Sequence, residues 1–178
     1  MLKKSQIWIE TAIYTLIGLT VIAIVLSIAN PQIEKIKDKS VVEQTITALN
    51  VLDSRILDIS QSSPGNIRII DFKIAKGRLE IDSESNQIVY TLENTRLELT
   101  QAGLKQEIRE GNVLIKTESQ GRKYKITLRL NYPNLDLTSN NEKKLVSLTA
   151  SSTPYKIQIE NVGDNQISQR THVDFALI

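Results

Sequence analysis

The stretch QIWIETAIYTLIGLTVIAIVLSIAN, residues 6–30, decides how this chain is organised. It comes directly after Lys3, Lys4 and a serine, and after Glu10 it continues over residues 11–29 without a charged side chain. An α-helix rises about 1.5 Å per residue, so about 20 apolar residues span the hydrocarbon core of a bilayer, which is about 30 Å thick. The sequence therefore predicts a transmembrane helix at residues 6–30, with one carboxylate near its start.

The composition predicts a single modest globular domain after this helix, of about 120–150 residues. The chain has 178 residues, of which 24% are charged and 4% aromatic, and its net charge is +2. So small a charge does not indicate a nucleic-acid partner, and we expect none. The chain has no cysteine, which excludes disulfide bonds, thiolate metal sites and cysteine nucleophiles.

Two ordinary explanations of the apolar segment remain open. A cleaved secretory signal has an apolar core of about 7–15 residues followed by small residues at the cut. This segment is longer, and its end, SIAN at residues 27–30, matches such a site poorly. An uncleaved anchor fits the length, and the lysines before it favour a cytoplasmic N-terminus and an exported C-terminal domain. The anchor does not explain Glu10, because a carboxylate in a membrane helix costs about 2.5–3.5 kcal/mol and usually has a partner or a function.

The residues around Glu10 suggest a third explanation. Lys4-Ser5-Gln6, followed by IWIE at residues 7–10, resembles the processing site of archaeal type IV prepilins, which carry a class III signal peptide. Ser5 stands where that family more commonly has glycine. The resemblance implies that a membrane-embedded prepilin peptidase cuts between Ser5 and Gln6. Glu10 then becomes the fifth residue of the mature chain, where the family's glutamate pairs with the N-terminal amine of a neighbouring subunit.

This resemblance also implies a function. The chain would be a structural subunit of an archaeal type IV pilus-like surface filament, drawn from the membrane by an assembly ATPase and a membrane platform. Its partners would be copies of itself or of related subunits, packed through the apolar helix, with the C-terminal domain on the filament surface. The alternative is an uncleaved, single-pass, membrane-anchored extracellular binding module. Both place the N-terminus in the cytoplasm and the domain outside.

A second, amphipathic helical segment is predicted at residues 31–61. Asn30-Pro31 marks the end of the apolar run, and SSPGN at residues 62–66 is rich in residues that favour turns. Between them, apolar residues recur mostly at spacings of three and four, which is typical of one helix face. We expect the charged residues between positions 34 and 43 to lie mostly on a solvated face. The predicted apolar stripe comprises Ile33, Ile36, Val42, Ile46, Leu49, Leu52, Ile56 and Ile59. We expect Leu49 to Ile59 to pack on the chain's own domain, whereas for Ile33 to Val42 both such packing and a contact with another subunit remain open.

The remaining residues predict an antiparallel β-rich head. Apolar and polar residues alternate with the period of two that half-buried strands show. Lys76-Gly77 is interpreted as the turn of a hairpin that joins two early strands. The predicted strands cover 70–74, 79–81, 88–92, 96–99, 112–117, 124–130, 145–149, 155–160 and 171–177. The fold class is thus α+β and sandwich-like, with a leader at 1–5, a membrane or filament-core helix at 6–30, an amphipathic helix at 31–61 and a head at 62–178.

The head offers no pattern typical of catalysis. His172 is the single histidine of the chain and is expected on a strand as a surface residue. With no second histidine and no cysteine, a zinc site would need an unusual set of carboxylates. The glycines form no phosphate-binding run, and no nucleophile motif surrounds the serines. We therefore expect no enzyme, no catalytic residue, no metal and no cofactor.

Overall fold

The computed structural model describes residues 2–101, 107–165 and 169–178, with side chains described from Trp8 onward. The chain divides into two compact units, Met1–Lys37 and Asp38–Ile178. Each unit is described by itself below. The first consists of helix, and the second, here called the head, holds the end of the same helix and all the described strands.

Helix α1 extends from Leu2 to Ser60 as one uninterrupted element. Pro31 lies inside it, although a proline lacks the backbone N–H that would bond to the preceding turn. The predicted division at residue 31 is therefore a change of composition within one helix. The helix ends at Ser60, one residue before the predicted end, and a turn over residues 61–65 leads into the first strand.

The 38–60 part of α1 supplies one side of the head's core. Six apolar side chains on one face are almost fully buried, which confirms the predicted packing of Leu49 to Ile59 on the head and shows that Val42, whose role the sequence left open, packs there too. Ile33 and Ile36, in the first unit, are exposed. Burying an aliphatic side chain contributes about 1.5–3 kcal/mol, so these six contacts contribute more to holding the helix than its helix propensity does. The buried residues are Val42, Ile46, Leu49, Leu52, Ile56 and Ile59.

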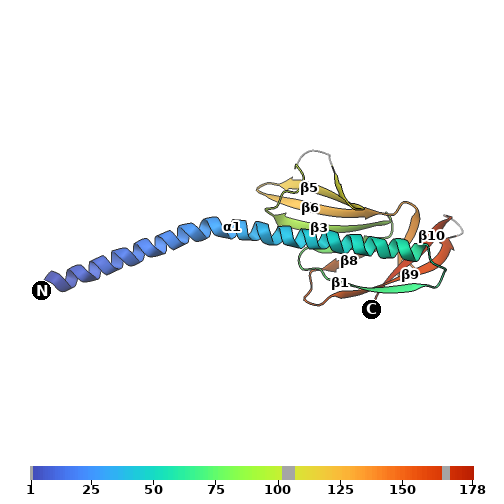
Figure 1. The fold of residues 1–178 in the computed structure, drawn as a ribbon, viewed down its shortest axis with the longest axis horizontal. Coiled ribbons are helices and arrows are strands. Elements are labelled where there is room, and N and C mark those ends of the chain that lie inside the picture. The colour runs from blue at the N-terminus through green and yellow to red at the C-terminus, as the bar shows by residue number, and fades with distance from the viewer. Residues whose placement is uncertain (1, 102–106, 166–168) are drawn as a thin grey trace. The chain divides into compact units, whose positions relative to one another are not determined.

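The strands form two sheets that are mostly antiparallel (Figure 1). In the four-stranded sheet the order is β1-β9-β10-β7, and only the β7–β10 pair is parallel. In the six-stranded sheet the order is β4-β5-β6-β3-β2-β8, and every pair is antiparallel. The bounds are β1 Ile67–Phe72, β2 Arg78–Asp82, β3 Gln87–Thr95, β4 Ile108–Glu110, β5 Val113–Gln120, β6 Lys123–Asn131, β7 Leu135–Ser139, β8 Leu145–Thr149, β9 Tyr155–Asn165 and β10 Arg170–Leu177.

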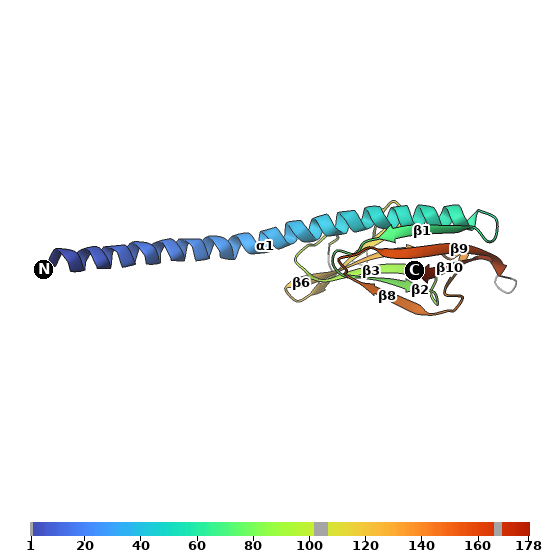
Figure 2. The same cartoon turned by 90° about the horizontal axis from the view of Figure 1, so that it is seen from below.

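One hydrophobic core joins the helix to both sheets. It combines the buried face of α1 with inward side chains such as Leu128 of the six-stranded sheet and Phe175 of the four-stranded sheet. In both views the 38–60 part of α1 runs alongside strands of the two sheets (Figure 1, Figure 2). The fold is therefore α+β, as the sequence predicts.

Several strand assignments made from the sequence need correction. The predicted hairpin at Lys76-Gly77 is wrong, because β1 pairs with β9 in one sheet whereas β2 pairs with β3 and β8 in the other. Residues 96–99 form no strand, and the short strands β4 and β7 were not predicted. The chain at residues 73–77 is thus a crossover between sheets, and it brings Lys76 to the end of the head where Asp38 lies.

Candidate functional site

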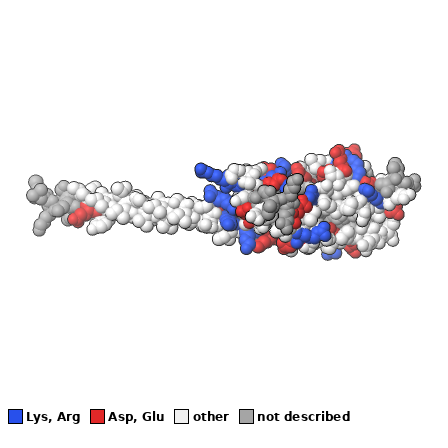
Figure 3. Space-filling view, turned by 90° about the horizontal axis from the view of Figure 1, so that it is seen from above, with Lys and Arg blue, Asp and Glu red and all other residues white. Residues whose placement is uncertain are grey.

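The most unusual surface of the chain is the apolar part of α1. Every residue from 8 to 28 is exposed, including Trp8 at 81% and Leu16 at 67% of their surface. Figure 3 shows this part of the helix as mostly white, uncharged surface, whereas the head carries both signs of charge. An apolar patch of this length is not stable in water, so lipid or other apolar helices must cover it. Within the described residues, this helix is the one long and apolar enough to cross a membrane.

The hydroxyl groups of this segment are satisfied within the helix itself. Thr15 Oγ1 donates to the carbonyl of Thr11 at 2.8 Å, and Thr20 Oγ1 donates to the carbonyl of Leu16 at 2.7 Å. Ser27 donates in the same way to Ile24 at 2.7 Å. Back-bonded hydroxyls need no water, so all three suit a helix surrounded by lipid tails or other helices. These three hydroxyl groups were not predicted as functional, although the residues that carry them are visible inside the apolar run.

Glu10 lies on the exposed surface near the start of this segment. The other predicted site residues, Lys4, Ser5 and Gln6, belong to α1, but their side chains lie outside the described residues. Gln6 precedes Glu10 by four residues, so the two positions are about one helical turn, or about 6 Å along the axis, apart. A cut after Ser5 would therefore leave the new amine one turn from the carboxylate.

In the head, two aspartates on the helix bind it to the sheets. Asp38 is 4% exposed; Thr95 Oγ1 donates to its Oδ2 at 2.6 Å, and Lys76 Nζ lies 2.5 Å from its Oδ1. The prediction that the charged residues between positions 34 and 43 lie mostly on a solvated face is therefore wrong for Asp38. Its carboxylate is buried because two partners from different strand ends compensate its charge.

Asp53 performs the same role further along the helix. Tyr132 donates its hydroxyl to Oδ1 at 3.0 Å, and Asn112 Nδ2 donates to Oδ2 at 2.6 Å. Burial and the adjacent carboxylate raise the pKa of Tyr132 above its ordinary value. The phenol therefore stays protonated and remains a donor to Asp53.

The end of α1 is capped by a side chain from β9. A helix leaves its last four carbonyls without partners inside the helix. Asn161 is 2% exposed, and its Nδ2 donates to the carbonyls of Ile59 at 3.0 Å and Ser62 at 2.8 Å. Its Oδ1 accepts a bond from the Gly163 amide at 2.8 Å. This asparagine thus joins the helix terminus to the four-stranded sheet.

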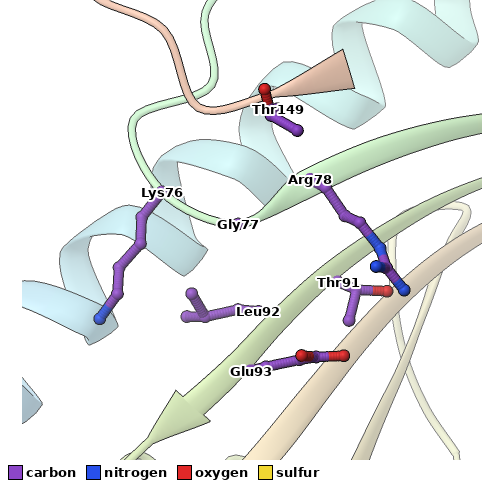
Figure 4. A pocket seen from close by; sticks show the side chains of 7 residues that line it. All are labelled: Lys76, Gly77, Arg78, Thr91, Leu92, Glu93 and Thr149. Carbon is purple, nitrogen blue, oxygen red and sulfur yellow. The ribbon is translucent and has the colours of Figure 1, made fainter. Parts of the chain in front are cut away.

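The head also has an open depression of about 320 Å³ at the start of β2 (Figure 4). Lys76, Arg78 and Glu93 give its rim both signs of charge. Gly77 has a φ of 81°, and a side-chain carbon there would lie 2.5 Å from the Thr91 carbonyl oxygen. The depression therefore depends on a glycine, but its mixed charge does not select one class of ligand.

A second polar cluster lies between β7 and β10. Lys143 Nζ lies 2.5 Å from Asp136 Oδ1, and Asn165 Nδ2 donates to the other oxygen at 2.6 Å. His172, predicted to be a surface residue, is half-buried, and its Nε2 lies 2.7 Å from Thr138 Oγ1. Among the described residues, no group of three or more histidines and carboxylates is placed to hold a metal ion.

Comparisons with protein-family models, with curated proteins and with solved structures found no match for this chain. The residues of the chain establish an exposed apolar helix, consistent with single-pass membrane anchoring, and a β-rich head.

Proposed function

We propose that this chain is a structural subunit of an archaeal type IV pilus-like surface filament. It enters the membrane with its N-terminus in the cytoplasm, is cut after Ser5 by a prepilin peptidase, and is assembled through α1. The head then lies outside the cell and forms the filament surface. A pilus assembly ATPase and a membrane platform are the partners that this function requires.

The observation that supports this proposal best is the combination of an exposed apolar helix with one carboxylate at its start. Residues 11–28 are exposed and uncharged, and their three back-bonded hydroxyls need no water. Such a surface suits two successive environments, the bilayer before assembly and a bundle of neighbouring helices afterwards. Glu10 is the feature that an ordinary anchor does not require.

The electrostatics of Glu10 favour pairing with an amine. A lone carboxylate in apolar surroundings costs about 2.5–3.5 kcal/mol on insertion scales. The N-terminal ammonium of a neighbouring subunit, produced by the same cut after Ser5, has the opposite charge, and the two groups together are tolerated where either alone is not. Since assembly would bring them together, the cost of the unpaired charge in the membrane favours the filament.

The first experiment determines the N-terminus of the chain in membranes and in filaments sheared from cells. Mass spectrometry of the sheared fraction should give a chain that starts at Gln6. A chain that retains Met1 and occurs only in membranes would overturn the proposal and favour the uncleaved binding module.

The second experiment replaces Glu10→Gln, which removes the charge and keeps the side-chain length. We expect membrane insertion and processing to continue while the amount of sheared filament falls at least tenfold. Glu43→Gln is the matched control, because Glu43 is an exposed helix glutamate whose ion pair with Lys39, at 3.7 Å, contributes at most about 1 kcal/mol. Equal filament yields from both variants would contradict the role given to Glu10.

A further inference from the structure

The end of the head at which α1 enters, here called the basal end, is marked by Asp38. Lys76 and Thr95 both contact Asp38, so the loop before β2 and the end of β3 lie there. Thr95 pairs with Tyr124 near the start of β6, which brings the β5–β6 turn to the same end. The β8–β9 loop joins them, because the Ser151 amide donates to the Ile74 carbonyl at 3.0 Å.

These basal loops carry an excess of positive charge. Lys73, Arg122 and Lys123 are exposed, and among the described residues they form no salt bridge. Arg96 and Lys76, of which Lys76 pairs with Asp38, are two further cations in these loops. Within the described part of the loops at 73–77, 96–101, 121–122 and 150–154, the sole acid is at position 98.

The opposite end of the head differs. The loops at 61–66, 111–112 and 132–134 carry no charge, and those at 83–86 and 140–144 carry two acids and two lysines. Charge is therefore polarised along the strands, with the positive end where the chain arrives from the apolar helix. Figure 3 shows blue side chains gathered at that end of the head.

The length of the connection brings this positive end within range of a bilayer. Eight residues lead from residue 30, where the apolar run ends, to Asp38, and eight residues of helix are about 12 Å long. The headgroup layer on one face of a bilayer is about 6 Å thick, and charges act over a Debye length of about 8–10 Å.

We propose that the basal end of the head binds an anionic lipid surface through Lys73, Arg122 and Lys123. This inference depends on the membrane-anchored stage of the proposed function and not on polymerisation. Lipid binding would hold the head against the membrane before assembly. It would also set a salt-sensitive barrier to extraction of the subunit.

The experiment uses the full chain in vesicles of phosphatidylcholine, with or without an equimolar share of phosphatidylglycerol. Because the chain has no cysteine, single cysteines at Ser152→Cys, in a basal loop, and at Ser63→Cys, at the opposite end, each carry one fluorophore. Energy transfer to an acceptor on lipid headgroups reports the distance of each end from the membrane. We expect the Ser152→Cys label alone to approach the anionic surface, and salt to reverse the approach.

The test variant is the triple replacement Lys73→Gln, Arg122→Gln and Lys123→Gln. Each cation near an anionic surface changes the ratio of bound to unbound heads about fivefold, so the triple variant should lower it about a hundredfold. The matched control is a triple replacement of the same charge at exposed positions away from the basal end, namely Arg55→Gln, Arg109→Gln and Arg170→Gln.

Three results would overturn the proposal: equal transfer in the two kinds of vesicle, equal loss in the two triple variants, or failure of the chain to float with either vesicle. Circular dichroism first establishes that each variant is folded. The proposed filament function is tested separately, because the cut after Ser5 and the Glu10→Gln phenotype do not involve these cations. If the head of the unsubstituted chain does not bind anionic lipid while filaments still form, this inference alone is refuted.

Discussion

Replacing Asn161→Ala removes the side chain that caps α1. Four hydrogen bonds are lost: those to the carbonyls of Ile59, Ser60 and Ser62, at 3.0, 3.5 and 2.8 Å, and that from the Gly163 amide at 2.8 Å. Each bond contributes about 0.5–1.5 kcal/mol net, and the groups left behind are largely buried, so the head should lose about 2–4 kcal/mol. Domains are stable by about 5–15 kcal/mol, which makes this a large fraction.

The assay is urea unfolding of the full chain in detergent micelles, followed by near-ultraviolet circular dichroism of the head's tyrosines. With a urea m-value of about 2 kcal/mol per M, which is the middle of the usual range, this loss should lower the midpoint by about 1–2 M. Asn161→Asp should be at least as harmful, because it loses both donors and places a negative charge at the negative end of the helix dipole. The exposed Asn134→Ala should change stability by less than about 0.5 kcal/mol. The argument fails if Asn161→Ala behaves like Asn134→Ala.

The other predictions concern turns, acid stability and processing. Gly77→Ala should destabilise the head by at least about 1 kcal/mol more than Gly121→Ala. Both glycines have a positive φ, but only at Gly77 would the added carbon contact the Thr91 carbonyl oxygen. Equal losses of stability in urea unfolding would refute this steric explanation. Burial opposes ionisation of Asp136, but hydrogen bonds from its lysine and asparagine partners outweigh it and lower its pKa below the ordinary 3.8. The stability that this carboxylate contributes is thus present above pH 3.8 and lost as the pH falls further. Asp136→Asn should therefore make the urea midpoint depend less on pH in this acid range. An unchanged pH dependence would contradict the lowered pKa of Asp136. Ser5→Gly should raise the fraction of chain that begins at Gln6, measured by mass spectrometry, and a lower fraction would refute the inferred cut.

The sequence predicted the elements whose pattern is local. The stripe from Val42 to Ile59 has helical spacing, and β8 at residues 145–149 was predicted with its observed bounds. The pairing was less predictable, because Lys76-Gly77 reads as a hairpin turn while the partner of β1 lies more than 80 residues further along the chain. Strand β7 was missed because its five residues are all buried, which removes the alternation that marks a half-buried strand.

Of the functional features, those that are local in sequence were predicted, and those that depend on distant partners were not. The apolar run and Glu10 are continuous in sequence, so their combination was visible without the structure. Asp38 was placed on the solvated face because the charged residues around it are exposed. Its burial depends on Lys76 and Thr95, which are 38 and 57 residues away in sequence, and no local pattern signals such partners.

The position of β9 and β10 determines the order in which the head can fold. These last strands occupy the centre of the four-stranded sheet, so β1 and β7 have no neighbour in that sheet until residues 155–177 are available. The end of α1 also remains uncapped until Asn161 has been synthesised. Contacts so distant in sequence form slowly, and the head cannot be completed during synthesis until almost the whole chain has emerged. A truncated chain would therefore have a complete helix and an open head.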